Sequence, residues 1–171
     1  MEQYIKNNYP KYKLLSSTTK CLTDLNAVKN EINNKDYYLT CLDYNLNQNL
    51  DFLKTFTQEE KNKTEILVNA ICPPNCPYRK EHYDLNSDYS LSYGKDYDMD
   101  KCLIRHSLMD PITLNSKNNL TPDMIINTYE PLGFSHFKIE GRTLSDIDVA
   151  CAYVYYMIKP EYQLLVLSIL F

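Results

Sequence analysis

Short apolar segments alternate along this chain with segments whose apolar residues recur at helical spacing. A strand, a helix and a second strand in succession are typical of a βαβ unit, whose two strands run parallel. We expect strands over residues 12–17, 37–42, 65–69 and 134–141, and helices over residues 24–33, about 50–56, 122–129 and 146–158. The order predicts an α/β fold with about four parallel strands, half the number in a closed (β/α)₈ barrel.

Local signals at the helix ends support this order. Asp24 is a good N-cap for the first of these helices, and Thr121 followed by Pro122 marks the start of a later one. Ser145 or Asp146 begins the last of them. Each cap offers a side-chain oxygen to a backbone N–H of the first helical turn, so the helix starts are encoded locally.

The periodicity fails between the third strand and the helix that begins near residue 122. Residues from about 84 to 119 are rich in Asp, Ser, Tyr and Asn, so we expect a long irregular loop there. Loops of this length in compact domains usually have a function or are disordered. Since no linker or repeat divides the 171 residues, and 44% of them are hydrophobic, we expect one domain over 1–171.

Two features of the composition exclude whole classes of function. The chain has three glycines, at positions 94, 133 and 141, and these cannot form GxGxxG or a P-loop. The formal net charge is -4, whereas an electrostatic nucleic-acid clamp needs a basic surface. The composition therefore argues against a nucleotide-binding loop and against a nucleic-acid partner.

The ends of the chain predict a cytoplasmic protein with no membrane segment. The N-terminus is polar and lacks the apolar region of a signal peptide. The longest apolar run, 164–171, is far shorter than the roughly 20 residues of a membrane span. We expect this run to form a buried terminal helix.

Six cysteines are many for a chain that does not look secreted, and two of them share a stiff loop. Cys72 and Cys76 directly follow the third strand, and the loop also holds Pro73, Pro74 and Pro77. Proline fixes the backbone and prevents continuation of the strand. In a reducing compartment, such clustered thiols are more often metal ligands or core residues than disulfides.

The other candidate ligands are more distant in the sequence. Four thiolates suit an iron–sulfur cluster, and Cys102 and Cys21 are candidates to complete a set with Cys72 and Cys76. A structural zinc site through Cys72, Cys76, Cys102 and His106 is an alternative. Ordinary buried thiols are a second alternative.

Five further residues have weaker signals. We interpret Cys41 and Cys151 as core thiols, because they fall in the middle of a strand and of a helix. We interpret His82 as a surface residue. Asp43 and Asn69 end predicted strands, so we expect them to line a pocket at the carboxyl ends of the sheet.

Charges cluster on one face of the last predicted strand. Phe137 and Ile139 share one face, while Lys138, Glu140 and Arg142 share the other. Parallel strands are usually apolar on both faces, so three charges indicate a polar barrel mouth. We therefore take the three charged residues as candidate catalytic residues. A salt-bridge network that closes the sheet is the alternative.

The segment 121–142, with Leu132-Gly133-Phe134 followed by FKIEGR, resembles the end of the barrel in the collagenase-like peptidases (peptidase family U-32). A similar xKIEGR element closes the last barrel strand in that family. Residues 65–76 resemble the family's cysteine-bearing segment, although Asn69-Ala70 stands where the family has His-Gly. The resemblance covers roughly residues 12–162, and the KIEGR element is its specific part.

This resemblance implies a partial TIM-like (β/α) barrel that corresponds to the C-terminal half of the family's domain. It also implies a [4Fe-4S] cluster, which several members hold through four cysteines. By position, Cys72 and Cys76 are the best ligand matches and Cys102 is the next. Some members act in the hydroxylation of RNA bases or of ubiquinone precursors, and others are named proteases.

Because half of a barrel is missing, the chain resembles a truncated or split protein. An open parallel sheet exposes an unpaired edge, so we expect a homo-oligomer or a second chain that completes the barrel. We expect an iron–sulfur half-barrel that belongs to a hydroxylation-type or peptidase-like enzyme, without activity of this chain alone. A zinc-stabilised binding module and an inactive barrel fragment are the alternatives.

Overall fold

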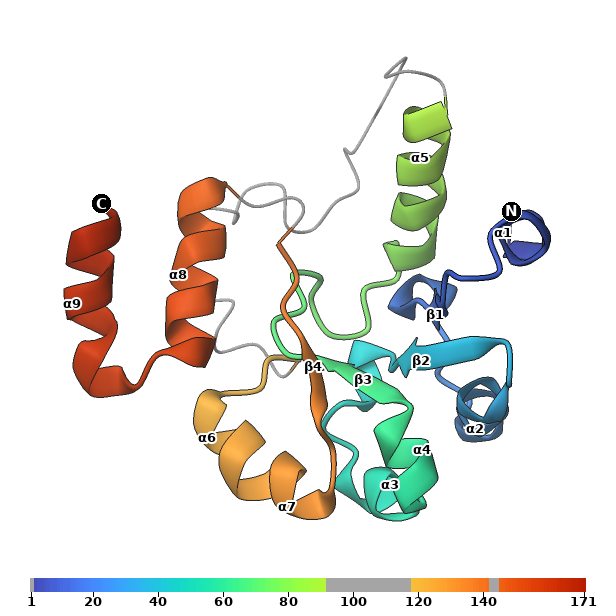
Figure 1. Ribbon diagram of the computed structural model, residues 1–171, viewed down its shortest axis with the longest axis horizontal. Helices are drawn as coiled ribbons and strands as arrows, with labels where there is room; N and C mark the ends of the chain where they lie inside the picture. Colours follow the sequence, from blue (N-terminus) through green and yellow to red (C-terminus); the bar gives the residue numbers. More distant parts are fainter. Residues whose placement is uncertain (1, 92–117, 142–144) are drawn as a thin grey trace.

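A four-stranded parallel sheet forms the centre of the computed structural model, which describes residues 2–91, 118–141 and 145–171 (Figure 1). The sheet order is β1-β2-β3-β4. The strands are β1 (Leu14–Ser16), β2 (Tyr37–Cys41), β3 (Thr64–Leu67) and β4 (His136–Lys138). Strands adjacent in the chain are also adjacent in the sheet and all pairs are parallel, as in part of a β/α barrel. The predicted α/β class is therefore confirmed.

Helices fill the connections between the strands. In Figure 1, most of the helices that come before β4 in the chain lie on one side of the sheet. Helix α5 is an exception and lies on the other side, and α1 lies near the N-terminus. The helices are α1 (Glu2–Asn8), α2 (Leu25–Asn33), α3 (Leu50–Lys54), α4 (Gln58–Asn62), α5 (Arg79–Leu91), α6 (Pro122–Met124), α7 (Glu130–Leu132), α8 (Asp146–Met157) and α9 (Pro160–Leu170). A π-helical segment, Ile125–Tyr129, joins α6 to α7. Single 3₁₀ turns, Thr18–Lys20 and Tyr44–Leu46, follow β1 and β2.

The helix caps act where the sequence indicated. The Asp24 carboxylate accepts the N–H of Ala27 at 2.8 Å at the start of α2. The Thr121 hydroxyl accepts the N–H of Met124 at 3.2 Å, and Pro122 occupies the first turn of α6. Ser145 caps α8 in the same way. The predicted starts of three helices are confirmed.

The main core lies between the sheet and the helices on its lower side in Figure 1. Its members come from every layer: Val28, Ile32, Leu42, Leu46, Phe52, Leu53, Phe56, Ile66, Val68, Leu120, Tyr129 and Phe134. The buried hydroxyl of Tyr129 donates to the backbone oxygen of Asn47 at 2.7 Å, so it retains a hydrogen bond. Phe137 and Ile139 pack against this core, which confirms the face predicted for them.

The predicted irregular loop is wrong at its beginning. Residues 84–91 are helical, because α5 extends from Arg79 to Leu91. Their composition is poor in strong helix formers. The first turn of α5 is anchored by the buried Arg79 and His82, and this tertiary anchor outweighs the weak propensity of the turns that follow. The rest of that prediction, residues 92–117, lies outside the described residues.

The expected buried terminal helix is also wrong in its burial. The run forms the greater part of α9, but none of the described residues of α9 is buried. The face of the sheet that carries the main core is already covered by α2, α3, α4, α6 and α7, so α9 packs beside α8 and not on the sheet (Figure 1). Among the described residues, no helix has both the length and the apolar character needed to cross a bilayer.

Candidate functional site

Polar side chains gather at the carboxyl ends of the four strands. Thr18 follows β1, Asp43 follows β2, Asn69 follows β3 and Glu140 follows β4. Because all four strands are parallel, these residues reach the same edge of the sheet. This carboxyl edge is where the binding site of a parallel α/β protein is expected.

Asn69 and Glu140 join the last two strands at this edge. The Asn69 amide donates to the backbone oxygen of Glu140 at 2.9 Å, and the N–H of Glu140 donates back to Asn69 Oδ1 at 2.6 Å. The Glu140 carboxylate accepts the N–H of Ile71 at 3.1 Å. Glu140 therefore holds the beginning of the cysteine loop against β4.

The cysteine loop, residues 71–78, is held from both sides. Asn75 has a left-handed φ of 53°, and its N–H donates to the Asn45 side chain at 2.8 Å. The Asn118 amide donates to the backbone oxygen of Cys72 at 3.1 Å. Cys72 also packs against a small cluster of buried side chains from the carboxyl edge, Cys41, Tyr44, Leu67 and Ala70.

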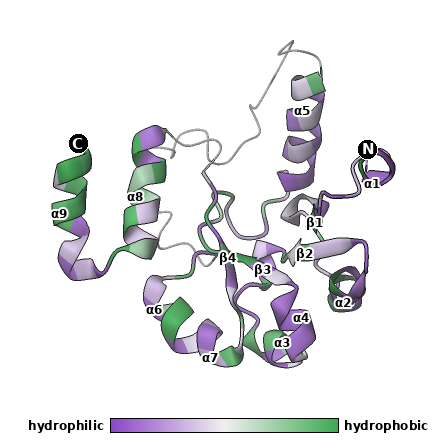
Figure 2. Cartoon of the chain, in the orientation of Figure 1, coloured by the Kyte–Doolittle hydropathy of each residue, from purple (hydrophilic) through white to green (hydrophobic). Residues whose placement is uncertain are grey.

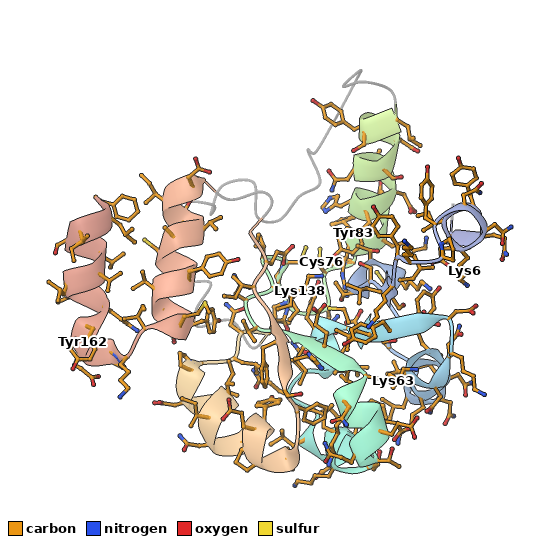
Figure 3. The ribbon with its side chains drawn as sticks, viewed as in Figure 1. Lys6, Lys63, Cys76, Tyr83, Lys138 and Tyr162 are labelled. Carbon is orange, nitrogen blue, oxygen red and sulfur yellow. The ribbon has the colours of Figure 1, made fainter. Side chains whose placement is uncertain are left out.

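Cys72 is close to other ionisable groups. Burial, together with the Glu140 carboxylate and the neighbouring Cys76 thiol, raises the pKa of the Cys72 thiol to about 11. The structure thus brings Cys72, Cys76 and Glu140 into one neighbourhood. At neutral pH the Cys72 side chain is a neutral thiol when no ligand is bound. In Figure 3, Cys76 and Tyr83 lie on the same side of the sheet as α5.

A buried ion pair anchors α5 beside this loop. The Arg79 guanidinium pairs with the Asp43 carboxylate, and the two side chains are 5% and 1% exposed. Arg79 also donates to the Thr18 backbone oxygen at 2.7 Å and to the Tyr83 hydroxyl at 3.1 Å. Its guanidinium lies over the Tyr44 ring at 3.9 Å.

Sequence reasoning placed Asp43 at the pocket but missed its partner Arg79. The sequence holds one signal for this anchor. In a helix that begins at residue 79, Arg79, His82 and Tyr83 share one face, because they stand at positions i, i+3 and i+4. That face is the one that turns toward the carboxyl edge.

Lys138 belongs to a separate group on the face of the sheet opposite the main core. Its ammonium pairs with the Glu65 carboxylate on the neighbouring strand at 3.4 Å. Cys41 lies beside this pair, and burial together with the Glu65 carboxylate raises the pKa of its thiol to about 12. Lys138 therefore neutralises a charge on the sheet, while Glu140 faces the cysteine loop. Arg142 lies outside the described residues.

The predicted four-cysteine set is not assembled within the described residues. Cys21 lies after the first 3₁₀ turn with a left-handed φ of 53°, and its thiol donates to the Thr19 backbone oxygen at 3.5 Å. Cys102 and His106 lie outside the described residues. In the part of the chain that the structure describes, no group of three His, Cys, Asp or Glu residues could hold a metal ion.

Three other sequence interpretations can be compared with the structure. Cys41 is buried, as predicted. The core assignment of Cys151 is wrong, because Cys151 is exposed on the outer face of α8. The surface assignment of His82 is also wrong, because His82 is 7% exposed. It lies one turn after Arg79, so the anchoring of α5 buries both.

Two buried polar atoms around the cysteine loop lack a hydrogen bond within the described part of the chain. They are the hydroxyl oxygen of Tyr44 and Nε2 of His82. A buried polar atom without a partner is costly, so a bound group or an ordered water would be favourable beside each of them. Cys72 and Cys76 are two of the four thiols that a four-cysteine cluster needs.

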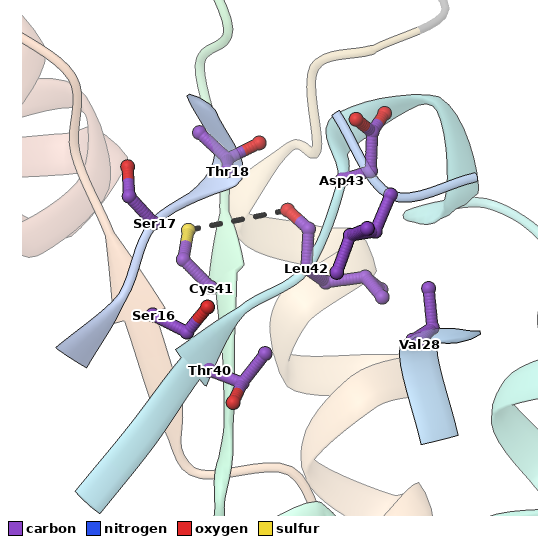
Figure 4. Close-up of a pocket in the computed structure, with 9 residues that line it drawn as sticks. Ser16, Ser17, Thr18, Val28, Thr40, Cys41, Leu42 and Asp43 are labelled. Carbon is purple, nitrogen blue, oxygen red and sulfur yellow. Dashed lines mark hydrogen bonds between the residues drawn. The ribbon is translucent and has the colours of Figure 1, made fainter. Parts of the chain in front are cut away.

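A narrow pocket opens at the same edge, between β1 and β2. Figure 4 shows Thr18 and Asp43 at its rim and Cys41 inside it, with Thr40, Leu42 and Val28 in its walls. The Cys41 thiol points to the backbone oxygen of Leu42 at 3.9 Å. The expected pocket residue Asp43 is therefore at a pocket, although its carboxylate is engaged by Arg79.

Comparisons of the chain with protein-family models, with curated proteins and with solved structures find no match.

Proposed function

We propose that this chain is a half-barrel protein of the U-32 peptidase type that holds an iron–sulfur cluster at its carboxyl edge. The observation that carries the proposal is the pair of neighbouring thiols, Cys72 and Cys76, on a stiff loop beside two unpartnered buried polar atoms. Cys102 is the proposed third ligand and Cys21 the proposed fourth. When bound, such a cluster supplies one-electron transfer.

The protonation of Cys72 sets the conditions for loading. Ligand thiols must be deprotonated to bind a metal. Since burial keeps the pKa of Cys72 near 11, loading releases its proton. The unpartnered hydroxyl of Tyr44, which packs in the same cluster, is the group that we propose to donate a hydrogen bond to the resulting thiolate.

The charged residues of the last strand have different proposed roles. Glu140 positions the cysteine loop through the N–H of Ile71. Lys138 neutralises Glu65 on the face that would line a barrel interior. Arg142, two residues after Glu140 in the sequence, is proposed as the third charged residue of this group. We propose that a partner, either a second chain or a second copy, supplies the remaining strands and the substrate of a hydroxylation-type or peptidase-like reaction.

The proposed location is the cytoplasm, because a reducing compartment keeps the ligand thiols free. The thiols of Cys21, Cys41, Cys72, Cys76 and Cys151 are all free.

Metal analysis with a visible spectrum tests this proposal. Protein purified without oxygen should be brown and should contain stoichiometric iron and sulfide. Cys72→Ser and Cys76→Ser should lose the colour and the iron. Cys151→Ser is the matched control, since Cys151 is an exposed thiol on α8 and not part of the cysteine loop, and this variant should keep both.

Three results would oppose the proposal. Colourless protein with no iron after chemical reconstitution would contradict it. Zinc in place of iron, with unfolding by a chelator, would select the zinc-stabilised module. Equal iron in the Cys72→Ser, Cys76→Ser and Cys151→Ser proteins would place the metal elsewhere. Circular dichroism of each variant separates loss of metal from loss of fold.

A further inference from the structure

The C-terminal helices carry a large apolar surface that does not contribute to the described core. We call it the hairpin surface, and each of its side chains is at least half exposed. Its members are Ile147, Tyr153 and Met157 of α8 with Tyr162, Leu164, Leu165, Ile169, Leu170 and Phe171 of α9 and its end. Leu164 and Ile169 are 82% and 75% exposed. Figure 2 shows the apolar character of α9 along most of its length.

The size of this surface is unusual for a monomer. Nine such side chains present apolar area on the order of the 800 Å² that each partner contributes to a standard interface. Monomeric soluble proteins rarely expose a contiguous apolar patch above a few hundred Å². A helix that is apolar on nearly all sides is normally buried on more than one side. Since α8 covers only one side of α9, a further layer is expected.

The charges on the hairpin argue against a lipid surface as this layer. The sequence carries no charged side chain over 149–158 or over 162–171. The charges at the hairpin ends are Asp146, Asp148 and Glu161 against Lys159. Helices that lie on membranes need Lys and Arg on their polar face to attract anionic lipids. An acidic hairpin without a basic face suits a protein partner better.

The position of the charges also favours one arrangement of two copies. The two helices run antiparallel, so Asp146 and Asp148 lie at the open end of the hairpin and Lys159 and Glu161 lie at its turn (Figure 1). If two hairpins packed with the same ends together, four aspartates would meet. A two-fold axis across the hairpin separates the aspartates of the two copies and brings each pair toward the partner's turn, where Lys159 and Glu161 offset each other, so this arrangement avoids the repulsion.

We propose that a second copy of this chain docks on the hairpin surface, so that two α8–α9 hairpins form a four-helix bundle. A two-fold interface uses the same patch on both copies, and helices that carry exposed apolar side chains and no charge over most of their length are self-complementary in that geometry. The bundle buries the hairpin surface without occupying the carboxyl edge. This proposal does not depend on a metal at the cysteine loop.

Sedimentation equilibrium of the full chain tests the proposal. The wild-type protein should be a dimer at micromolar concentration. Leu164→Lys and Ile169→Lys should each raise the dimer dissociation constant at least about 30-fold, which is the hot-spot threshold for an interface residue. Leu91→Lys is the matched control, because Leu91 is 74% exposed on α5 and apolar, and its variant should stay dimeric.

A second pair of variants tests the antiparallel arrangement. Lys159→Glu should weaken the dimer roughly tenfold at low salt, because it adds a like charge near the partner's aspartates, and added salt should relieve the effect. Lys80→Glu, at an exposed lysine of α5, should leave the dissociation constant unchanged. An unchanged constant for Lys159→Glu would overturn the arrangement.

Other occupants give distinct results, and each overturns the proposal. Monomeric wild-type protein at 100-fold higher concentration, on the order of 0.1 mM, would contradict the second copy. A monomer that floats with vesicles of phosphatidylcholine and phosphatidylserine, and loses binding on Leu164→Lys, would assign the surface to lipid. A monomer that Leu164→Lys unfolds would mean that another segment of the same chain covers the hairpin. Circular dichroism of each variant establishes folding.

Discussion

Arg79 and Asp43 form the most deeply buried ion pair among the described residues. Their side chains are 5% and 1% exposed, and they join helix α5 to the end of strand β2. Every arm of the guanidinium has a partner, because Thr18 and Tyr83 accept the remaining hydrogen bonds. Since removal of one partner leaves a buried charge uncompensated, this pair is sensitive to substitution.

We predict that Arg79→Met lowers the free energy of unfolding by about 3–5 kcal/mol. The unbranched Met side chain fills part of the space but leaves Asp43 unpaired. Lys80→Ala is the control, because Lys80 and Asp84 form an exposed pair with side chains 75% and 66% exposed. That change should cost less than about 0.5 kcal/mol. Urea unfolding measures both, and similar losses for the two variants would contradict a buried anchor.

The two described glycines differ in what they require of the backbone. An added Cβ at Gly141 would lie 3.1 Å from Val149 Cγ2, which is closer than ordinary van der Waals contact. Gly133 has the left-handed conformation, with a φ of 99° at the C-cap of α7. A Cβ there would lie 2.7 Å from Gln58 Oε1. Gly133 ends the helix before β4, where only a residue without Cβ is relaxed.

At the scale of the element, α4 is a short helix with a strong N-terminal cap. Thr57 and Glu60 form a capping box, in which the Glu60 carboxylate accepts the N–H of Thr57 at 2.8 Å. The same carboxylate accepts hydrogen bonds from Lys29 at 3.1 Å and Asn33 at 3.0 Å. Glu60 therefore ties α4 to α2, and its side chain is 8% exposed.

The environment of Glu60 makes this tie dependent on pH. Burial alone would raise the pKa of Glu60, but the hydrogen bonds from Thr57, Asn33 and Lys29 outweigh it and lower the pKa below 4.5. A carboxyl group with a lowered pKa in the folded state stabilises the fold above its unfolded value near 4.5. That contribution is lost as the pH falls through the folded value.

We predict that Glu60→Gln lowers the free energy of unfolding by about 1–2 kcal/mol at pH 7. The deficit should shrink below about pH 4 and vanish once Glu60 is protonated in the wild type. Glu59→Gln is the control, because Glu59 is exposed on the same helix. Urea unfolding at pH 7 and pH 3 provides the comparison. A deficit of equal size at both pH values would show that the charge of Glu60 is not responsible.

At the scale of the whole molecule, stability is concentrated in the sheet and the core beneath it. The N–H of Leu42 donates to the backbone oxygen of Glu65, and the N–H of Val68 donates to the backbone oxygen of Lys138, both at 2.9 Å. The side chains of Leu42 and Val68 are nearly inaccessible to solvent. The last turns of α5, Ser87–Leu91, are exposed throughout. This contrast in burial predicts that local stability falls steeply from the sheet to the end of α5.

We predict that the amides of Leu42 and Val68 exchange with solvent only through global unfolding, whereas those of Ser87–Leu91 exchange within the dead time of a manual experiment. Ile32 in α2 is a helical control, because its side chain is buried in the core, and its amide should follow Leu42. Hydrogen exchange by NMR measures all of these rates. Protection of Ser87–Leu91 equal to that of Ile32 would contradict the predicted gradient of local stability.

Most of the described architecture could be predicted from the sequence, because its signals are local. The strand segments, the caps at Asp24, Thr121 and Ser145, and the α/β order depend on residues within a few positions of one another. The candidate site was predicted only in part. Cys72, Cys76 and Glu140 were identified one by one, but Arg79, Tyr44 and His82 were not, since their importance depends on burial.

The sequence by itself determined which segments become strands and helices, because side-chain periodicity and capping act over one or two turns of the chain. Only the tertiary structure decided which of those segments meet. Glu140 reaches the cysteine loop across 69 residues and Arg79 reaches Asp43 across 36. The tertiary structure also left α9 exposed, since the helices before β4 already cover the face of the sheet that carries the main core. Such contacts follow from packing in three dimensions, which periodicity along the chain does not encode.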